Sequence, residues 1–579
     1  SPNIALTTHQ GMRPVYDETL CAFLPAALPP GMVVAGAAAG VFTTAEALRD
    51  GAQAGARAAQ ACGFAAEQPA LPEAEPESCA IAPLFHALAD VPSARWAKAF
   101  VDFQNDVTAK DVALAAREGF VSVEHLKRYT TLGMATDQGK TSNVNAIALL
   151  AEITQRPIGQ TGTTLIRPPT QPVAIGALAG AHRGRHFKPA RLPPTHQWAE
   201  SQGAVFTANG LWQRAQWYPR PGETDWLQTV NREVRTVREA VGFCDVTTLG
   251  KIDIQGPDAA EFLERVYVNA WKKLPVGRAR YGLMLREDGF AYDDGTTARL
   301  GETHYVMTTT TANAGGVMAH LEFCHQWLWP ELDVQFISVT DEWAQIAVAG
   351  PQARNVLRHV VDPAFDLSNE AFPYMAAGEV TVCGGVQARL FRLSFSGELA
   401  YELAVPARYG DALARRLMEV GAPYGIAPYG TEALGVMRIE KGHPAGPELN
   451  GQTTAHDLGM GRMLSTRKDF IGRHMAQREA LTDPARPTLV GLQPLNPADQ
   501  VVAGAHLLPD GAAATAASDQ GWVSSAAFSP TLGSWIGLGL LSNGPARYGE
   551  IVALHNPLAG TVVRARVVSP VFVDPEGAR

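Results

Sequence analysis

The spacing of apolar residues changes several times along this chain, and these changes limit it to a fold of several domains. Helical spacing predominates over residues 98–155, α and β signals alternate over 226–475, and short strands are predicted from about 486 onward. Residues 156–225 are rich in Pro, Gly and Arg and have no sustained period. A segment of that length usually has a function or wraps around a neighbour. With 579 residues, the chain has room for three or four domains.

The first 66 residues contain too few elements to close a sheet. Residues 32–36 read as a short buried strand, residues 37–40 as a turn, and an Ala-rich helix is predicted from Thr44 to about Gln60. We expect this unit to be the last part of a domain whose larger part lies elsewhere. The alternative is that it packs on later segments. Residues 67–97 begin with a Pro- and Glu-rich stretch and are predicted to form an extended linker.

Charge and cysteine spacing argue against several functions. The net charge of −9 gives no electrostatic footprint for nucleic acid or for an anionic membrane. The six cysteines are scattered and form no CxxC pair, which favours free thiols in a reducing cytoplasm over a zinc or iron–sulfur site. The most apolar early stretch is broken by Pro29-Pro30, and no signal peptide is evident. We therefore expect a cytoplasmic protein with no metal site and with no nucleic-acid or membrane partner.

Helix signals define a small module after the linker. Thr108 and Asp111 form a capping box in front of a helix, and Gly119 can end that helix. Ser122 can begin a second helix, and a third is predicted from about residue 142 to 153.

Residues 132–143 contain a Gly-Lys-Thr-Ser sequence that looks like the end of a nucleotide-binding loop. That loop requires four residues between its glycines and a buried strand before it. Here five residues separate Gly133 from Gly139, and residues 125–131 read as a helix. Both requirements fail, so the sequence does not favour an ATP site.

The same helix start has the chemistry to bind another phosphate. Gly139 lets the backbone approach a ligand, Thr141 or Ser142 can cap the following helix, and Lys140 adds a positive charge. The alternative is an ordinary capped helix with a solvated lysine, and local sequence alone favours that alternative.

Several long segments resemble the alpha subunit of heterotetrameric sarcosine oxidases. These segments are 99–111, 127–134, 137–140, 247–252, 280–285, 394–398 and 428–432. The resemblance covers nearly the whole chain. It implies a multidomain α+β protein.

The domains implied by the resemblance follow the changes in periodicity. They are the C-terminal part of a dinucleotide-binding α/β domain (1–66), the linker (67–97), a small helical module with a wrapping segment at a flavin interface (98–190), an aminomethyltransferase-like, folate-binding α+β domain (191–480) and a C-terminal β-barrel (481–579). The chain would then be a truncated form or one product of a split gene. Another chain would supply the missing glycine motif of the first domain.

The resemblance also implies two cofactor contacts in the first part of the chain. Ala37, Phe42 and Thr44 match positions that touch NAD. The helical module is similar to iron–sulfur modules that use four cysteines, but no cysteine lies between Cys79 and Cys244. In the sarcosine oxidases the equivalent module helps to hold FMN against the beta subunit. The residues implied here for the FMN phosphate are Gln138, Gly139, Lys140 and Thr141.

Residues 397–402 are similar to the folate-binding strand of aminomethyltransferases, whose pattern is Gly-Glu-x-x-Tyr-Glu. In those enzymes the second Glu accepts two parallel N–H bonds from the pterin edge, and Glu402 matches it. Strand alternation predicts that Glu398 lies on the same face, although Glu398 can also be a solvated edge residue.

Four further folate contacts are implied. Asp245 lies between apolar residues, and the resemblance assigns it to the folate nitrogens as proton acceptor and as a charge that stabilises an iminium. The alternative for Asp245 is a buried acid that caps the next turn. Thr310 matches a folate-contacting threonine. For Tyr281 and Arg438, a folate-binding role and a structural role are equally open. Residues 293–294 are predicted to shape a turn rather than to bind a metal.

The function implied is that of one subunit of a heteromeric flavoenzyme. A beta-type partner would carry FAD and oxidise sarcosine or a related N-methyl amino acid, with gamma and delta subunits also present. The one-carbon unit would pass to tetrahydrofolate and give 5,10-methylenetetrahydrofolate, while electrons would pass from FAD to FMN.

Residues 443–452 differ from the commonest sarcosine oxidase pattern, so an N-methylglutamate-type dehydrogenase subunit remains an alternative. A stand-alone folate-dependent aminomethyltransferase and a non-catalytic scaffold subunit are the others.

Overall fold

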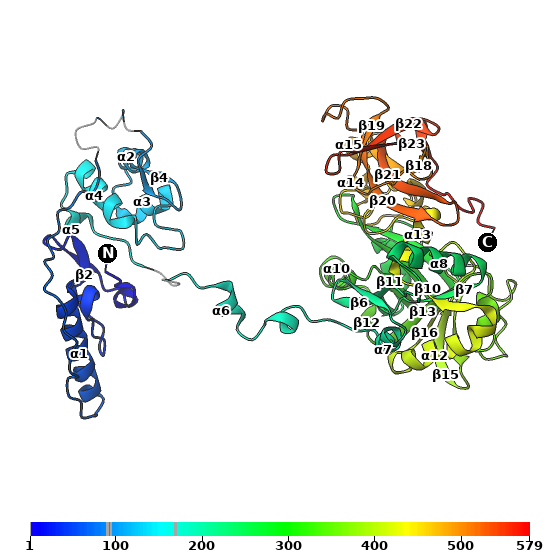
Figure 1. Ribbon diagram of the computed structural model, residues 1–579, viewed down its shortest axis with the longest axis horizontal. Helices are drawn as coiled ribbons and strands as arrows, with labels where there is room; N and C mark the ends of the chain where they lie inside the picture. The colour runs from blue at the N-terminus through cyan, green and yellow to red at the C-terminus, as the bar shows by residue number, and fades with distance from the viewer. Residues whose placement is uncertain (1, 88–91, 93–94, 96, 167–170, 579) are drawn as a thin grey trace. The chain divides into compact units, whose positions relative to one another are not determined.

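The computed structural model describes residues 2–87, 92, 95, 97–166 and 171–578 (Figure 1). The chain divides into two compact units, Ser1–Phe187 and Lys188–Arg579, which we call the first and the second unit. In the described part of the chain, none of the helices combines the length and apolarity that crossing a bilayer would need.

The first unit has a core made by three short helices and a hairpin. The helices are α2 (Ala109–Arg117), α3 (Val123–Thr130) and α4 (Asn143–Thr154), and the hairpin pairs β1 (Pro14–Asp17) with β2 (Ala22–Pro25). The predicted capping box of α2 is confirmed, because the Asp111 N–H donates to the Thr108 hydroxyl and the Asp111 carboxylate accepts from the Thr108 N–H. Tyr16 and Phe23 of the hairpin pack against buried residues of the helices. The three predicted helices therefore need the early hairpin to complete their core.

The prediction of a strand at residues 32–36 is wrong. Residues 32–35 have no regular structure, and a short 3₁₀ helix, η2 (Gly36–Ala39), follows them. A strand needs a neighbour for its N–H and C=O groups, and no described strand pairs with this segment. The predicted helix is confirmed as α1 (Thr44–Ala61), but none of its residues is buried.

Smaller elements complete the first unit. They are η1 (Ala5–Thr8), β3 (Phe100–Asp102), β4 (Val107–Thr108), α5 (Ile158–Thr161), α6 (Ile175–Ala179) and η4 (Gly184–His186). Residues 64–86 have neither helix nor strand.

The second unit contains two antiparallel sheets. The five-stranded sheet has the order β12 (Gln335–Ser338), β8 (Gly250–Gln255), β11 (His304–Thr309), β10 (Ala291–Gly301) and β9 (Arg278–Leu285). The six-stranded sheet has the order β14 (Ala377–Val382), β15 (Val386–Phe391), β16 (Ala400–Pro406), β13 (Trp343–Ala349), β7 (Val241–Asp245) and β17 (Ile426–Pro428), with only β7 and β17 parallel.

Helices cover the outer faces of both sheets. Phe262 and Leu263 of α9 (Ala259–Val266) and Val317 of α10 (Ala314–Phe323) pack on the five-stranded sheet. The other covering helices are α7 (His196–Ser201), α11 (Ala353–Leu357) and α12 (Gly410–Gly421) on the six-stranded sheet, and the π-helix η5 (Cys324–Leu328) after α10. A hairpin of β5 (Val205–Asn209) and β6 (Trp212–Trp217) lies before α8 (Trp226–Glu239).

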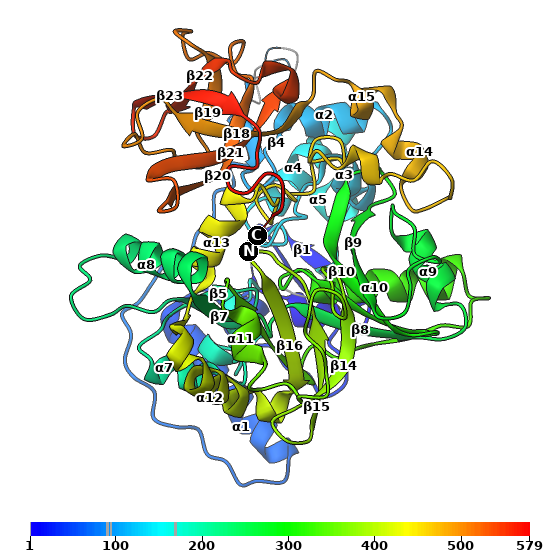
Figure 2. The ribbon, with the colours of Figure 1, turned by 90° about the vertical axis from the view of Figure 1, so that its right-hand side faces the viewer.

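The predicted C-terminal barrel is confirmed as a closed six-stranded barrel (Figure 2). Its order is β18 (Pro487–Pro494), β21 (Ser534–Ser542), β20 (Gly521–Ser529), β19 (His506–Pro509), β22 (Ile551–Asn556) and β23 (Thr561–Val568). Helix α13 (Thr431–Glu440) and α8 share one buried core with the barrel residues Leu489, Ile536 and Leu538. The barrel is thereby fixed against the sheet region.

Short helices α14 (Arg473–Ala476) and α15 (Glu479–Thr482) precede the barrel, and short 3₁₀ turns complete the unit: η6 (Ala407–Tyr409), η7 (Ala422–Tyr424), η8 (Gly461–Met463) and η9 (Gly544–Arg547).

Two local predictions in the sheet region are wrong. Asp293 and Asp294 lie within β10 and not in a turn, since their backbones pair with Met284 and Leu283 of β9. Strand β15 ends at Phe391, a turn at residues 394–397 follows, and β16 begins only at Ala400. Glu398 therefore lies outside β16, and it is buried in an ion pair with Arg238 instead of being solvated.

We expect Arg438→Met to lower the free energy of unfolding of the second unit by about 3 kcal/mol, because it leaves the Glu448 carboxylate buried without its cation. The side chains of this pair are only 8% and 0% exposed, and Arg438 also donates to the Ser525 hydroxyl of the barrel. Urea unfolding followed by tryptophan fluorescence measures the change, since every tryptophan except Trp96 lies in the second unit.

The matched control is Arg416→Met, whose ion pair with Glu419 is 45% and 71% exposed. This control is expected to change stability by about 0.5 kcal/mol or less. Equal effects of the two substitutions would contradict a structural role for the Arg438 pair.

Candidate functional site

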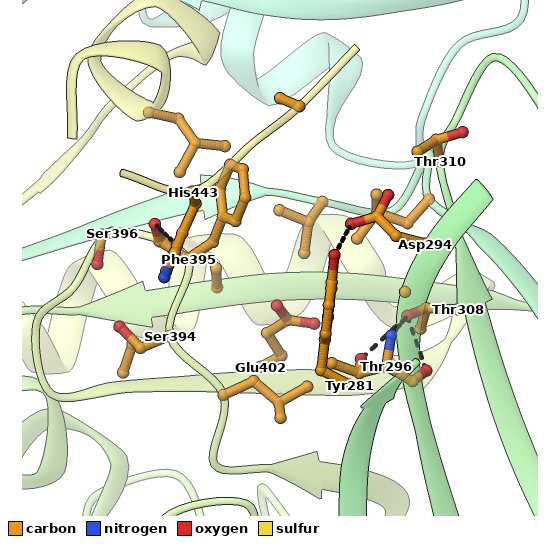
Figure 3. A pocket seen from close by; sticks show the side chains of 18 of the residues that line it. Tyr281, Asp294, Thr296, Thr308, Thr310, Ser394, Phe395, Ser396, Glu402 and His443 are labelled. Carbon is orange, nitrogen blue, oxygen red and sulfur yellow. Dashed lines mark hydrogen bonds between the residues drawn. The ribbon is translucent and has the colours of Figure 1, made fainter. Parts of the chain in front are cut away.

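A cavity of about 480 Å³ lies between the two sheets of the second unit (Figure 3). Strands β9 and β10 contribute Tyr281 and Asp294 from one sheet, and β16 contributes Glu402 from the other. Apolar side chains such as Leu393 and Met460 form much of the remaining wall. A mostly apolar cavity of this size with a few convergent polar groups is typical of small-molecule sites. We call it the central cavity.

Asp294 is held by Tyr281 across one wall of the central cavity. The Tyr281 hydroxyl donates to Asp294 Oδ2 over 2.8 Å (Figure 3). Burial raises the pKa of Asp294 to about 6, and the neighbouring charge of Asp293 adds to the rise, while the Tyr281 bond opposes it. A carboxyl group with this pKa can both accept and release a proton near neutral pH.

Asp293 points to a different partner. The Thr310 hydroxyl donates to Asp293 Oδ1 over 2.6 Å, and the Thr310 N–H donates to Oδ2 over 3.3 Å. Burial raises the pKa of Asp293 as well, and these bonds oppose the rise. The two adjacent carboxylates are therefore separated by their partners, and Asp294 is the one that lines the cavity.

Glu402 brings a carboxylate into the cavity from β16. Its Oε2 accepts a hydrogen bond from the Gln345 side chain, and the described residues give no hydrogen bond to Oε1. Burial raises the pKa of Glu402, whereas the Gln345 bond and the positive charge of Lys251 lower it. Oε1 is thus available to a ligand that donates hydrogen bonds, and Oε2 has a second lone pair that can accept another.

Lys251 and Gln345 are joined through Thr247 in a buried network behind the cavity. Lys251 Nζ donates to the Thr247 and Leu249 carbonyls over 2.5 and 3.1 Å. The Gln345 N–H donates to the Thr247 hydroxyl over 3.0 Å. Burial lowers the pKa of Lys251 to about 8, and the charges of Asp245 and Glu402 oppose this. The network fixes the segment that carries Val246 and Leu249 into the cavity wall.

The five residues predicted for folate do not all meet. Tyr281, Thr310 and Glu402 line the central cavity. Asp245 does not lie among the described lining residues, because its carboxylate accepts from the Thr195 hydroxyl and, over 2.7 Å, from the Thr247 N–H. The guanidinium of Arg438 is bound to Glu448 and Ser525, outside this cavity.

The predicted FMN and NAD residues lie in the first unit, where carboxylates of the chain occupy both helix starts. Asp137 accepts from the Gly139 N–H, the Thr141 N–H and the Thr141 hydroxyl in front of α4. The capping side chain expected from Thr141 or Ser142 is not formed, since Ser142 is the N-cap residue and its hydroxyl is buried without a described partner. In front of α1, Glu77 accepts from the Thr44 N–H and hydroxyl.

Asp294, Gln345 and Lys251 were not among the predicted site residues. A signal for Asp294 was present in the sequence, because two adjacent acids on a strand point to opposite faces and one of them then faces the interior. Lys251 lies in an alternating stretch on the face opposite Ile252 and Ile254, so the sequence predicts a polar face there, whereas the structure buries its side chain. Gln345 has no sequence signal of its own, because its role depends on the pairing of β13 with β16.

Comparison with known protein families agrees with the observed domains. Residues 195–468 match the GCVT N-terminal domain, and residues 488–574 match the glycine cleavage T-protein C-terminal barrel domain. Residues 96–182 match the sarcosine oxidase A3 domain.

The individual relatives include both sarcosine oxidase alpha subunits and aminomethyltransferases. The "Sarcosine oxidase subunit alpha" of Rhizobium meliloti (strain 1021) is 53% identical over 580 residues, which covers 100% of this chain and 58% of that protein. An "Aminomethyltransferase" of Saccharopolyspora erythraea is 31% identical and covers 66% of this chain and 98% of its own length. The chain thus spans about three fifths of the oxidase subunits that it matches.

One solved structure supports the fold of the second unit. The glycine cleavage system aminomethyltransferase T from Bartonella henselae aligns with a TM-score of 0.56 at 24% identity. It covers 66% of this chain and 98% of that chain.

We expect Asp294→Asn to stabilise the second unit, and to do so more at pH 8 than at pH 5. The folded pKa of about 6 lies above the usual value of 3.8, so the folded chain holds the proton more tightly and loses stability as pH rises through this window. The difference corresponds to at most about 3 kcal/mol above pH 7. Urea unfolding at the two pH values measures it. A gain of equal size at pH 5 and pH 8 would contradict the raised pKa.

Proposed function

The chain belongs to the sarcosine oxidase alpha-subunit family, and from this premise we propose that it transfers one-carbon units to tetrahydrofolate within a heteromeric flavoenzyme. The amine would be sarcosine or a related N-methyl amino acid, and the product 5,10-methylenetetrahydrofolate. The proposal rests most on one observation: the half-buried Glu402 carboxylate has an oxygen available to a ligand in a mostly apolar cavity.

Glu402 suits the pterin edge of a folate. That edge presents adjacent N–H groups, and a carboxylate accepts such a pair with two parallel bonds. Gln345 holds the carboxylate in position, and Lys251 favours its ionised form. The cavity has the volume and the apolar walls that a planar heterocycle requires.

Asp294 is the group that we propose to move the proton. It lines the same cavity as Glu402, and its pKa of about 6 suits proton transfer near neutral pH. Tyr281 orients it through the bond to Oδ2. Asp245, predicted for this role, remains a weaker candidate because its carboxylate is already bound by Thr195 and Thr247.

The oxidation itself would take place on a partner subunit. There FAD would accept two electrons from the amine, with FMN at the interface between the subunits. The predicted FMN contact at residues 138–141 requires Asp137 to release the Gly139 and Thr141 groups that it now holds. The buried Ser142 hydroxyl would be a further donor for such a phosphate. NAD at Ala37, Phe42 and Thr44 and a cytoplasmic location remain predictions.

Two other functions, a stand-alone aminomethyltransferase and an N-methylglutamate-type dehydrogenase subunit, are distinguished by experiment. The complete match to an aminomethyltransferase favours a stand-alone transferase, but such an enzyme has no need of the A3-type module at residues 96–182. An N-methylglutamate-type dehydrogenase subunit is compatible with the divergent segment 443–446, which lines the cavity and can alter substrate choice. Purification with native partners and flavin extraction distinguishes them: a colourless monomer that binds folate would contradict the flavoenzyme assignment.

We expect Glu402→Gln to weaken tetrahydrofolate binding about 10- to 100-fold, because charged hydrogen bonds contribute about 1.5–3 kcal/mol. Isothermal titration measures the dissociation constant. The flavin content of the purified complex is expected to stay unchanged. Glu379→Gln, on the exposed side of β14, is the control and should bind folate as the wild type does. Equal affinity of Glu402→Gln and the wild type would remove the folate site from this cavity.

Lys140→Met is expected to lower the FMN content of the purified complex while leaving its FAD content unchanged. The reason is the loss of a positive charge beside the α4 start, where phosphate would bind. Flavin extraction and chromatography measure both cofactors. Lys110→Met, on the exposed side of α2, serves as control. An unchanged ratio of FMN to FAD in Lys140→Met would contradict the proposed phosphate contact.

A further inference from the structure

A second chamber of about 330 Å³ adjoins the central cavity. The two share Arg214, Phe395, Leu434 and Ala445 in their walls. The end of β5 and the first residue of the turn after it, residues 207–210, form another part of the chamber wall. A ligand that fills the central cavity can therefore extend into this chamber past Arg214.

Arg214 differs from the other arginine of the chamber. The guanidinium of Arg438 is neutralised by Glu448. Arg214 donates from Nη2 to the Asp245 carbonyl over 3.2 Å, while its Nε is buried without a partner among the described residues. No carboxylate in the described part of the chain forms an ion pair with it. A half-buried guanidinium is costly without an anion, and its planar donor set matches a carboxylate.

We propose that the second chamber binds a carboxylate of the ligand, with Arg214 as its cation. The inference rests on the proposed folate function, because Glu402 would hold the pterin in the central cavity and Arg214 lies where the two chambers join. The carboxylate has two chemical sources: the glutamyl group of the folate itself, or the amino acid from which the one-carbon unit comes. In either case Arg214 selects ligands by charge at a distance from the pterin.

The experiment compares three probes on the full chain by isothermal titration: tetrahydrofolate, a tetrahydropterin without a glutamyl group, and p-aminobenzoylglutamate. The variants are Arg214→Met, Arg214→Lys and the control Arg235→Met, which removes an exposed arginine of α8. Glycine and sarcosine are tested as competitors. Thermal unfolding midpoints show that each variant is folded.

We expect Arg214→Met to lose about tenfold in affinity for tetrahydrofolate and for p-aminobenzoylglutamate, and less than twofold for the tetrahydropterin. Arg214→Lys should recover part of the loss, and Arg235→Met should match the wild type. This result supports the glutamyl source. If the two glutamyl probes bind unchanged, but glycine or sarcosine competes with wild type and not with Arg214→Met, the amino acid is the source.

Unchanged binding of every carboxylate probe in Arg214→Met overturns the proposal. Failure of the proposed function gives a different result, because then the tetrahydropterin does not bind the wild type. In that case p-aminobenzoylglutamate binding that depends on Arg214, in both the wild type and the Glu402→Gln background, still supports a carboxylate chamber.

Discussion

The arrangement of the second unit depends on holding the charge of Glu402 between two sheets. Burial alone raises the pKa of this carboxyl group, and Gln345 and Lys251 counter that effect by a hydrogen bond and a positive charge. Lys251 is itself buried, and the Thr247 and Leu249 carbonyls bind its ammonium group. Strands β8, β13 and β16 must all be in register for this network to form. The same network therefore couples the packing of the sheets to the shape of the cavity.

Much of the local structure could be predicted from the sequence, because its signals are local. The capping box at Thr108, the helix that begins at Thr44 and the C-terminal barrel are all confirmed. Residues 32–36 have the composition of a strand, but a strand also requires a neighbour, and composition does not report one. Asp293 and Asp294 look like turn residues for the same reason: only their pairing with β9 places them in a strand.

The residues of the candidate site show the same difference between local sequence signals and tertiary contacts. Glu402, Tyr281 and Thr310 are predicted from the resemblance of their neighbouring residues to family patterns, and they line one cavity. The role of a buried polar residue without such a pattern is harder to predict from the sequence, since a structural role and a ligand-binding role require the same burial. Asp245 is absent from the described lining of the central cavity, and Arg438 lines only the second chamber, where Glu448 binds its guanidinium. Arg214 and Asp294 line the central cavity. Only tertiary contacts separate the two groups.

The most direct test of the account is a crystal structure of the chain with tetrahydrofolate. The account predicts electron density for the pterin in the central cavity, with two of its N–H groups donating to Glu402 and with Asp294 beside it. A pterin bound elsewhere, with the Glu402 carboxylate bonded only to Gln345, would contradict the central claim.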